Sequence, residues 1–195
     1  FLDEKPEGNT GTTGNFYKNK EDIEYALTAA YANLQAGAMY KEYMVLMTDV
    51  RSDDLGSFAN TGGNAGREYS IKIFTAQSDN QIFRSVWQKT YETIYRCNNV
   101  IYHIDIVKDS KLKLQYEAEA RFLRALCYFN IVRFWGDAPL ILTPLTATEV
   151  AECERNKVAD IYAAIETDLQ FASDANNLPK VFTGKNSGRA TSLAA

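Results

Sequence analysis

Two pairs of closely spaced carboxylates are the residues of this sequence whose types and spacing could carry out chemistry. The pairs are Asp53 with Asp54 and Glu117 with Glu119. Two carboxyl groups that flank a glycosidic bond can hydrolyse it by acid and base catalysis. Chain neighbours rarely face the same bond, however, and residues two apart on a helix point in different directions. The sequence also lacks the G-x-S-x-G, H-E-x-x-H and G-x4-G-K-S/T motifs. We therefore expect a protein that is not an enzyme.

The histidine and cysteine content argues against a metal site. His103 is the only histidine, so a His-rich metal site or a Ser-His-Asp triad would depend on it alone. We expect a solvated or capping imidazole on a polar helix face. Cys97, Cys127 and Cys153 fit neither a zinc knuckle nor a disulfide framework in number and spacing. The first two fall on apolar helical stripes, and we expect them to be buried. No metal and no cofactor are expected.

The overall composition predicts one folded domain. Of the 195 residues 46% are apolar, and 12 tyrosines and 10 phenylalanines exceed what a minimal core requires. This aromatic excess fits either a tightly packed helical core or a ligand surface that uses rings as platforms. The net charge is −4, and the scattered Lys and Arg residues form no basic stripe of the kind that nucleic-acid-binding proteins have. We expect no binding to DNA or RNA.

Hydrophobic periodicity predicts an all-α fold. Residues 1–15 are expected to form an extended leader, and residues 140–154 to be irregular. Asn19 is the expected N-cap of the first helix, and Gly37 is its expected end. The helices expected at about 81–107 and 111–135 should form an antiparallel pair, because only a short polar link joins them. The further helices are expected at about 39–50, 81–107, 111–135 and 158–172.

The helix within residues 111–142 is expected to be central, because apolar residues cover two adjacent stripes along it. Only a narrow polar edge remains. Gly136 suits a left-handed position after its last turn, and Pro139 cannot continue the helix. One stripe holds Ala118, Phe122, Ala125, Phe129 and Val132, the other Tyr116, Ala120, Leu123, Cys127, Ile131 and Phe134, and the polar edge Glu117, Arg121, Arg124 and Tyr128.

Residues 51–80 interrupt the helical pattern. A stretch of about 30 residues without helical period is long for a loop in a compact domain, and loops of that size are usually functional or disordered. Phe58, Tyr69 and Phe74 stand between its polar residues, so its composition is not that of a disordered linker. The alternation from Tyr69 to Phe74 predicts a short strand.

Six segments of the sequence, in order, resemble the SusD/RagB family of outer-membrane nutrient-binding lipoproteins. Ala118, Phe122 and Ala125 also match the spacing of a tetratricopeptide second helix, although the first-helix signature of that repeat is missing. The family resemblance covers nearly the whole chain. The segments are FLDEKPEGNTG, NFYKNKEDIEYALTAAYANLQ, VWQKTYETIYRCNNVIYHI, EARFLRALCYFNIVRFWGDAPLI, ADIYAAIETDLQFASDANNLP and GRATSLAA.

The resemblance implies a tetratricopeptide-like helical array with long inter-helix loops. It also implies a surface-exposed lipoprotein of the outer membrane, which pairs with a TonB-dependent (SusC-like) transporter and captures oligosaccharides for import. The alternative on the same scaffold is a peptide-binding module or a lid that only docks on the transporter. The lipid anchor of the family is missing from residues 1–195, so we expect a trimmed N-terminal portion of a longer SusD-like domain, cut at Ala195 inside a helix that is just starting.

The loop from residue 51 to residue 80 is the expected ligand-binding segment. Sugars present apolar C–H faces and hydroxyl groups, so a sugar site needs exposed rings beside amide, carboxylate and guanidinium groups. This loop combines all of them. The alternative is that its rings only pin the loop to the helices. The expected ligand contacts are Asp53, Asp54, Phe58, Asn60, Asn64, Arg67 and Tyr69.

Overall fold

The computed structural model of the chain describes residues 16–54 and 63–195, without the side chains of residues 63–65 and 185. Within these ranges the chain folds into α-helices and short helical turns with no strand, apart from one isolated bridge between Ala138 and Asn156. The predicted all-α class is therefore confirmed. The leader expected at residues 1–15 lies outside the described residues.

The first described helix, α2 (Lys20–Leu34), begins where the sequence predicts. The Asn19 side chain accepts a hydrogen bond from the Asp22 backbone N–H, and the Asp22 carboxylate accepts one from the Asn19 N–H. This capping box satisfies amide groups that the helix itself leaves without partners. Gly37 does not end the helix, because α2 stops at Leu34 and Gly37 begins a separate π-helical turn, η1 (Gly37–Lys41).

The helix expected at about 39–50 is interrupted. Met39 has φ −118° and ψ −136°, which kinks the backbone, and the regular helix α3 covers only Tyr43–Asp49. The kink places the Met39 side chain in a buried cluster with Ile71 and Ile82. Packing against residues from two other helices therefore decides the local backbone, and no helix-breaking residue marks the kink in the sequence.

The expected loop at residues 51–80 contains a helix, α4 (Gly63–Lys72), and the strand expected from Tyr69 to Phe74 is wrong. The alternation of Tyr69, Ile71 and Ile73 has the period of a strand. Ile71 is nevertheless fully buried in the cluster with Met39, whereas Ile73 is exposed. Phe74 then turns the chain with a φ of 59°. Three glycines in and before α4 weaken the helical signal in the sequence.

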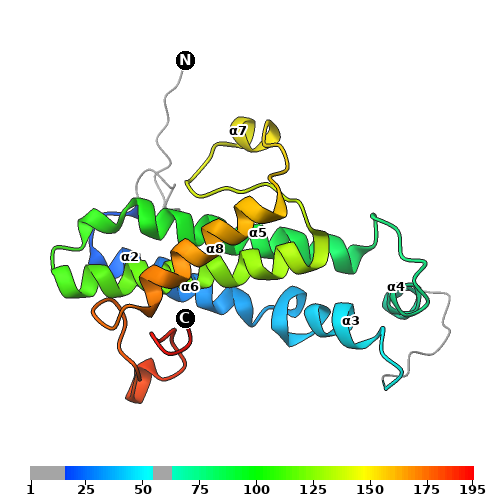
Figure 1. Cartoon of the computed structure of the whole chain (residues 1–195), viewed down its shortest axis with the longest axis horizontal. Coiled ribbons are helices and arrows are strands. Elements are labelled where there is room, and N and C mark those ends of the chain that lie inside the picture. The colour runs from blue at the N-terminus through cyan, green and yellow to red at the C-terminus, as the bar shows by residue number, and fades with distance from the viewer. Residues whose placement is uncertain (1–15, 55–62) are drawn as a thin grey trace, which may run out of the picture.

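The long helices α5 (Gln81–Tyr102) and α6 (Ser110–Trp135) form the expected antiparallel pair, and α8 (Val158–Ser173) lies across α6 (Figure 1). Helix α5 ends at Tyr102, and its expected last turn is a separate 3-10 turn, η2 (Ile104–Ile106). The segment expected to be irregular contains a short helix, α7 (Ala147–Ala151), and a 3-10 turn, η3 (Gly184–Asn186), follows α8. The four helices α2, α5, α6 and α8 make the body of the molecule, and α3 and α4 make one end (Figure 1).

Helix α6 is central, as predicted, but half of its polar edge is buried. Arg124 and Tyr128 are buried, since α8 and the chain after Pro139 cover that side. Phe129, which was assigned to an apolar stripe, is 39% exposed, and Phe122 is half-buried. The sequence identified the helix but not which of its sides the rest of the chain would cover.

The corner after α6 returns the chain along the helical pair. Gly136 has φ 68° and ψ −124°, so the positive φ that favours glycine is confirmed, although ψ is not that of a left-handed helical residue. Ala138 and Asn156 exchange backbone hydrogen bonds of 3.2 and 3.0 Å. Their pairing closes a loop whose first part, residues 139–145, we call the strap.

Candidate functional site

The predicted ligand contacts do not all come together. Asp53 and Asp54 are exposed in the turn after α3. Phe58 and Asn60 lie outside the described residues, and Asn64 lies in the first turn of α4, where only the backbone is described. The remaining two, Arg67 and Tyr69, lie on α4 and line the same cavity. That cavity includes neither aspartate.

The cavity beside α4, which we call the α4 hollow, has a volume of about 690 Å³ and is open to solvent. Arg67 is exposed and Tyr69 is half-buried. The buried Asn80 side chain donates to the Arg67 carbonyl at 3.2 Å, so it joins α4 to the start of α5. Amides and a carboxylate complete a mixed lining of the kind that sugar hydroxyls can bind. The other polar side chains in this lining are Ser70, Thr75, Gln77, Asp79 and Gln81.

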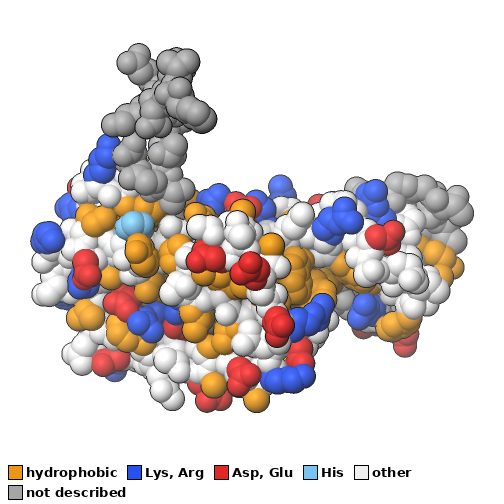
Figure 2. Space-filling model, turned by 90° about the horizontal axis from the view of Figure 1, so that it is seen from above, with side chains coloured by type: hydrophobic (Ala, Val, Ile, Leu, Met, Phe, Trp, Pro, Cys, Tyr) orange, Lys and Arg blue, Asp and Glu red, His pale blue; other side chains and the backbone are white. Residues whose placement is uncertain are grey.

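Trp87 on α5 lies between two further open cavities, of about 460 and about 520 Å³. The first, which we call the arginine cavity, is lined by Phe83, Phe134 and Trp135 together with three arginines. Trp87 and Trp135 meet edge to face, with ring centroids 5.1 Å apart. Figure 2 shows exposed hydrophobic side chains at the narrowing between the body and the end that carries α4, with basic side chains close to them.

The second cavity, which we call the tyrosine cavity, lies between α5 and the strap. Tyr91 and Tyr95 line it with Gln88 and Glu92, and Ile141 belongs to the opposite wall. The Tyr91 hydroxyl donates to the Pro139 carbonyl at 2.7 Å, and burial raises its pKa, so it stays protonated. Rings beside an amide and a carboxylate could take part in sugar binding.

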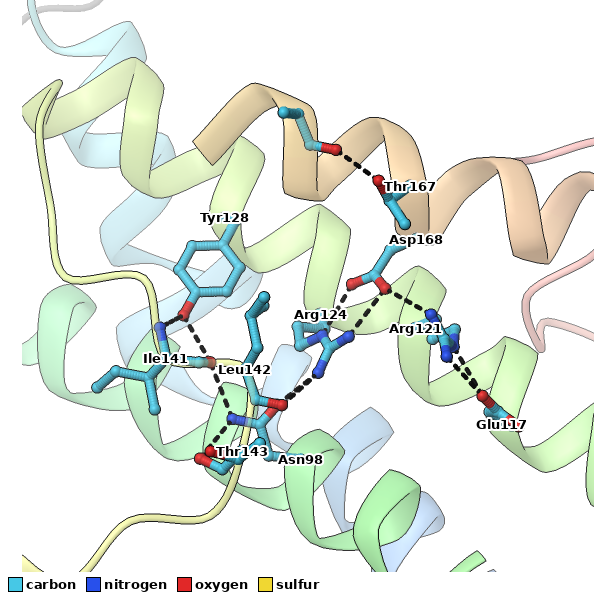
Figure 3. Close-up of polar contacts among 11 residues, drawn as sticks. Asn98, Glu117, Arg121, Arg124, Tyr128, Ile141, Leu142, Thr143, Thr167 and Asp168 are labelled. Atoms are coloured by element: carbon cyan, nitrogen blue, oxygen red, sulfur yellow. Dashed lines mark hydrogen bonds and ion pairs between the residues drawn. The ribbon is translucent and has the colours of Figure 1, made fainter. Parts of the chain in front are cut away.

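A buried polar network holds the strap in place (Figure 3). Arg124 donates to both carboxylate oxygens of Asp168 at 2.8 Å, and it also reaches Asn98 at 2.8 Å and the Leu142 carbonyl at 2.9 Å. Asn98 in turn donates to the Ile141 carbonyl at 2.9 Å. A bidentate guanidinium–carboxylate pair is strongly directional. The network therefore fixes one wall of the tyrosine cavity.

Tyr128 adds a second attachment for the strap. Its hydroxyl donates to the Ile141 carbonyl at 2.9 Å and accepts from the Ile141 N–H at 2.6 Å. Burial raises the pKa of this phenol, so it remains a donor at neutral pH. Both attachments come from the side of α6 that the sequence presented as a polar edge.

Glu117 and Glu119, the pair of carboxylates on α6 that was considered for catalysis, each form an ion pair. Glu117 pairs with Arg121 at 2.7 Å, and Glu119, with 0% exposure, pairs with Arg189 at 2.7 Å. Burial raises the pKa of Glu119 against the opposing effects of Arg189, Gln115 and Tyr31. The two groups thus belong to separate ion pairs.

The histidine and the two buried cysteines pack within the fold. His103 is half-buried at the C-terminal cap of α5, where its backbone N–H donates to the Asn99 carbonyl and its ring stacks on the Tyr17 ring with centroids 4.2 Å apart. The backbone of His103 therefore caps the helix, and the imidazole packs against an aromatic ring. Burial raises the pKa of the Cys97 thiol to about 12 and that of Cys127 well above its usual value, as expected for buried thiols. No group of three or more His, Cys, Asp or Glu side chains suited to a metal ion occurs in residues 16–54 and 63–195.

Sequence reasoning missed the surface around Trp87. Phe83, Trp87 and Tyr91 share one apolar stripe of α5, and by its helical period alone such a stripe indicates a face that packs in the core. All three are instead half-buried and line cavities. The available signal was the aromatic excess, which already allowed a ligand surface built from rings.

Comparison with known proteins places the whole chain in one family. A family model described as "Starch-binding associating with outer membrane" matches residues 1–195. SusD-like protein P25 from Formosa agariphila is 28% identical over 100% of this chain and 38% of its own length. The chain spans between 30% and 38% of the length of the four curated relatives that it matches.

Solved structures agree with the sequence matches. A laminarin-binding SusD-like protein superposes with a TM-score of 0.79 at 28% identity, over 90% of this chain and 38% of that one. Surface glycan-binding protein A from Bacteroides fluxus gives 0.77 at 27% identity, again over 90% and 38%. None of the described helices has the length and hydropathy needed to cross a membrane. The chain belongs to the SusD-like family, whose description associates it with the outer membrane.

Proposed function

We propose that the protein containing this chain captures oligosaccharides at the cell surface and delivers them to a TonB-dependent transporter in the outer membrane. SusD-like glycan-binding proteins are not enzymes. The family description supports the location, and the relatives named for glycan and laminarin binding support the ligand class. The transporter partner and the lipid anchor rest on the family resemblance.

The observation that carries the proposal is the position of Trp87 between two open, ring-lined cavities, with the α4 hollow nearby in the fold. Rings can stack on the apolar faces of sugars, and the amides and carboxylates beside them can bind hydroxyl groups. Sites for linear oligosaccharides need several such subsites in reach of one another. We place ligand contacts at Arg67 and Tyr69 in the α4 hollow, and Asp53, Asp54, Phe58, Asn60 and Asn64 stay predictions.

The test is a binding experiment on the intact protein, including any sequence that flanks residues 1–195. A glycan array with laminarin- and starch-derived oligosaccharides is compared with a peptide library. We expect glycans to bind, and the double variant Arg67→Ala/Tyr69→Ala to bind at least about tenfold more weakly, a loss of ~1.4 kcal/mol. Lys20→Ala/Tyr25→Ala is the matched control, because both residues are exposed on α2.

Each possible result of these experiments tests one alternative to the proposal. Unchanged affinity in the double variant, with folding verified by circular dichroism, would place the site away from the α4 hollow. Peptide binding without glycan binding would favour the peptide-binding alternative. Shorter products from a labelled glycan would reveal catalysis. Failure of the protein to co-purify with an outer-membrane transporter from its own membranes would contradict the proposed partnership.

A further inference from the structure

The arginine cavity differs from the other two in the chemistry of its lining. Arg51, Arg84 and Arg155 border it, and all three side chains are exposed. Among the lining residues there is no Asp, Glu, Asn or Gln, and Ser78 is the one uncharged polar residue. The described chain thus gathers three positive charges at one open, ring-lined cavity although the whole chain carries a net charge of −4.

None of these three arginines forms an ion pair within the described part of the chain, although the Asp137 carboxylate lies close enough to Arg155 for that guanidinium to help lower its pKa. The ion pairs there engage Arg96, Arg121, Arg124 and Arg189 but none of the three. Arg155 donates one Nη1 hydrogen bond of 2.8 Å to the Asp137 carbonyl, and Arg51 lies 5.5 Å from the Phe74 ring centroid. Each guanidinium group has five N–H donors, so most of the donors remain available to a ligand.

The hydrogen-bonding groups that line the cavity, mostly donors with few acceptors, indicate which class of ligand it suits. A neutral sugar offers hydroxyl groups that both donate and accept, and it is best held by a mixture of amides and carboxylates. The α4 hollow and the tyrosine cavity have that mixture. Guanidinium groups only donate, and their planar fork matches the oxygens of carboxylates and of tetrahedral oxyanions. The arginine cavity therefore suits a ligand group that only accepts hydrogen bonds and carries negative charge.

We infer that the arginine cavity binds the charged residues of an anionic oligosaccharide, with a carboxylate or sulfate group held by Arg51, Arg84 and Arg155. This inference rests on the proposed glycan-binding function and names the class of glycan. The sugar ring packs against Trp87, Phe83 or Trp135, and its anion lies among the guanidinium groups. Neighbouring neutral sugars of the same chain extend toward the other two cavities.

The test measures binding of the intact protein to an array of carboxylated, sulfated and neutral oligosaccharides, followed by titration calorimetry with the best ligand and its neutral counterpart. Carboxyl-reduced and desulfated forms of each ligand distinguish the two sources of charge. The triple variant Arg51→Gln/Arg84→Gln/Arg155→Gln should bind an anionic glycan at least about 100-fold more weakly, and neutral glycans unchanged. Affinity for the anionic glycan should also fall as salt is raised, because salt screens exposed charges.

Two further variants control for folding and location. Arg84→Gln alone removes an exposed side chain that forms no ion pair within the described chain, so it should weaken anionic binding about tenfold without affecting stability. Arg133→Gln removes an exposed arginine of α6 that lies on the Phe129 ring, away from this lining, and should leave binding unchanged.

The outcomes separate this inference from the proposed function. Binding of neutral glycans only, equal in the wild-type and triple-variant proteins, would overturn the anionic assignment and leave glycan capture standing. Binding of polyglutamate in preference to every anionic glycan would also overturn it. Binding of no glycan of any class would refute the proposed function itself.

Discussion

The buried side of α6 and the arginine cavity use the same residue type in opposite ways. On α6, Arg124 is 5% exposed and donates to Asp168, Asn98 and a backbone carbonyl. At the cavity, Arg84 is exposed and has no ion pair in the described chain. A charge in the core must have its partners within the fold, because burial without them is costly. A charge at an open cavity can take its partner from outside, so the contrast distinguishes structural from ligand-binding arginines.

The largest expected effect comes from removing the buried counter-charge. Asp168→Asn keeps the side-chain shape but leaves the Arg124 guanidinium without its anion, and we expect a loss of ~3 to 5 kcal/mol of unfolding free energy. Urea unfolding of the intact protein measures it. The double variant Arg124→Met/Asp168→Leu should recover much of the loss, because neither buried charge of this pair then remains. If Asp168→Asn lowers the unfolding free energy by less than about 1 kcal/mol, water or a shift of the Arg124 side chain must replace the lost carboxylate, as happens for exposed pairs.

An intermediate effect is expected from the pH dependence of the second buried pair, Glu119 with Arg189. Burial raises the pKa of Glu119 above its ordinary value of 4.5. A group whose pKa is raised in the folded state contributes most stability below its unfolded pKa, and this contribution is lost as pH rises through the folded pKa. Glu119→Gln cannot titrate, so the melting temperature of the wild-type protein relative to that of the variant should be higher at acid pH than at neutral pH. The opposite slope would mean that the ion pair outweighs burial.

The smallest expected effect is on the stability of the cavity variants. Arg84→Gln should change the unfolding free energy by less than about 0.5 kcal/mol, since the side chain is exposed and unpaired in the described chain. Arg124→Gln, measured in the same way, should be strongly destabilising. Similar losses for the two would contradict the division into structural and ligand-binding arginines.

The fold was predictable to the extent that it depends on local pattern. The capping box at Asn19, the bounds of α6 and α8 and the turn at Gly136 follow from residues within a few positions of each other. The kink at Met39 and the helix α4 were not predictable in this way. Both depend on the buried cluster that joins Met39, Ile71 and Ile82, which are far apart in the sequence.

The candidate site was predictable only in part. The sequence pointed to Arg67 and Tyr69, and the structure places both at one hollow. It did not point to Trp87, because an amphipathic stripe has the same period whether it faces a core or a cavity.

By itself, the sequence determined an all-helical chain, the positions of most helices and the family, because periodicity, caps and ordered motifs are local properties of the chain. Only the tertiary structure decided which polar residues are buried and which arginines face solvent. Arg124 meets Asp168 from 44 positions away, and the arginine cavity brings Arg51 together with Arg155. Burial and electrostatic pairing depend on what packs against a residue, and that partner comes from a distant part of the chain.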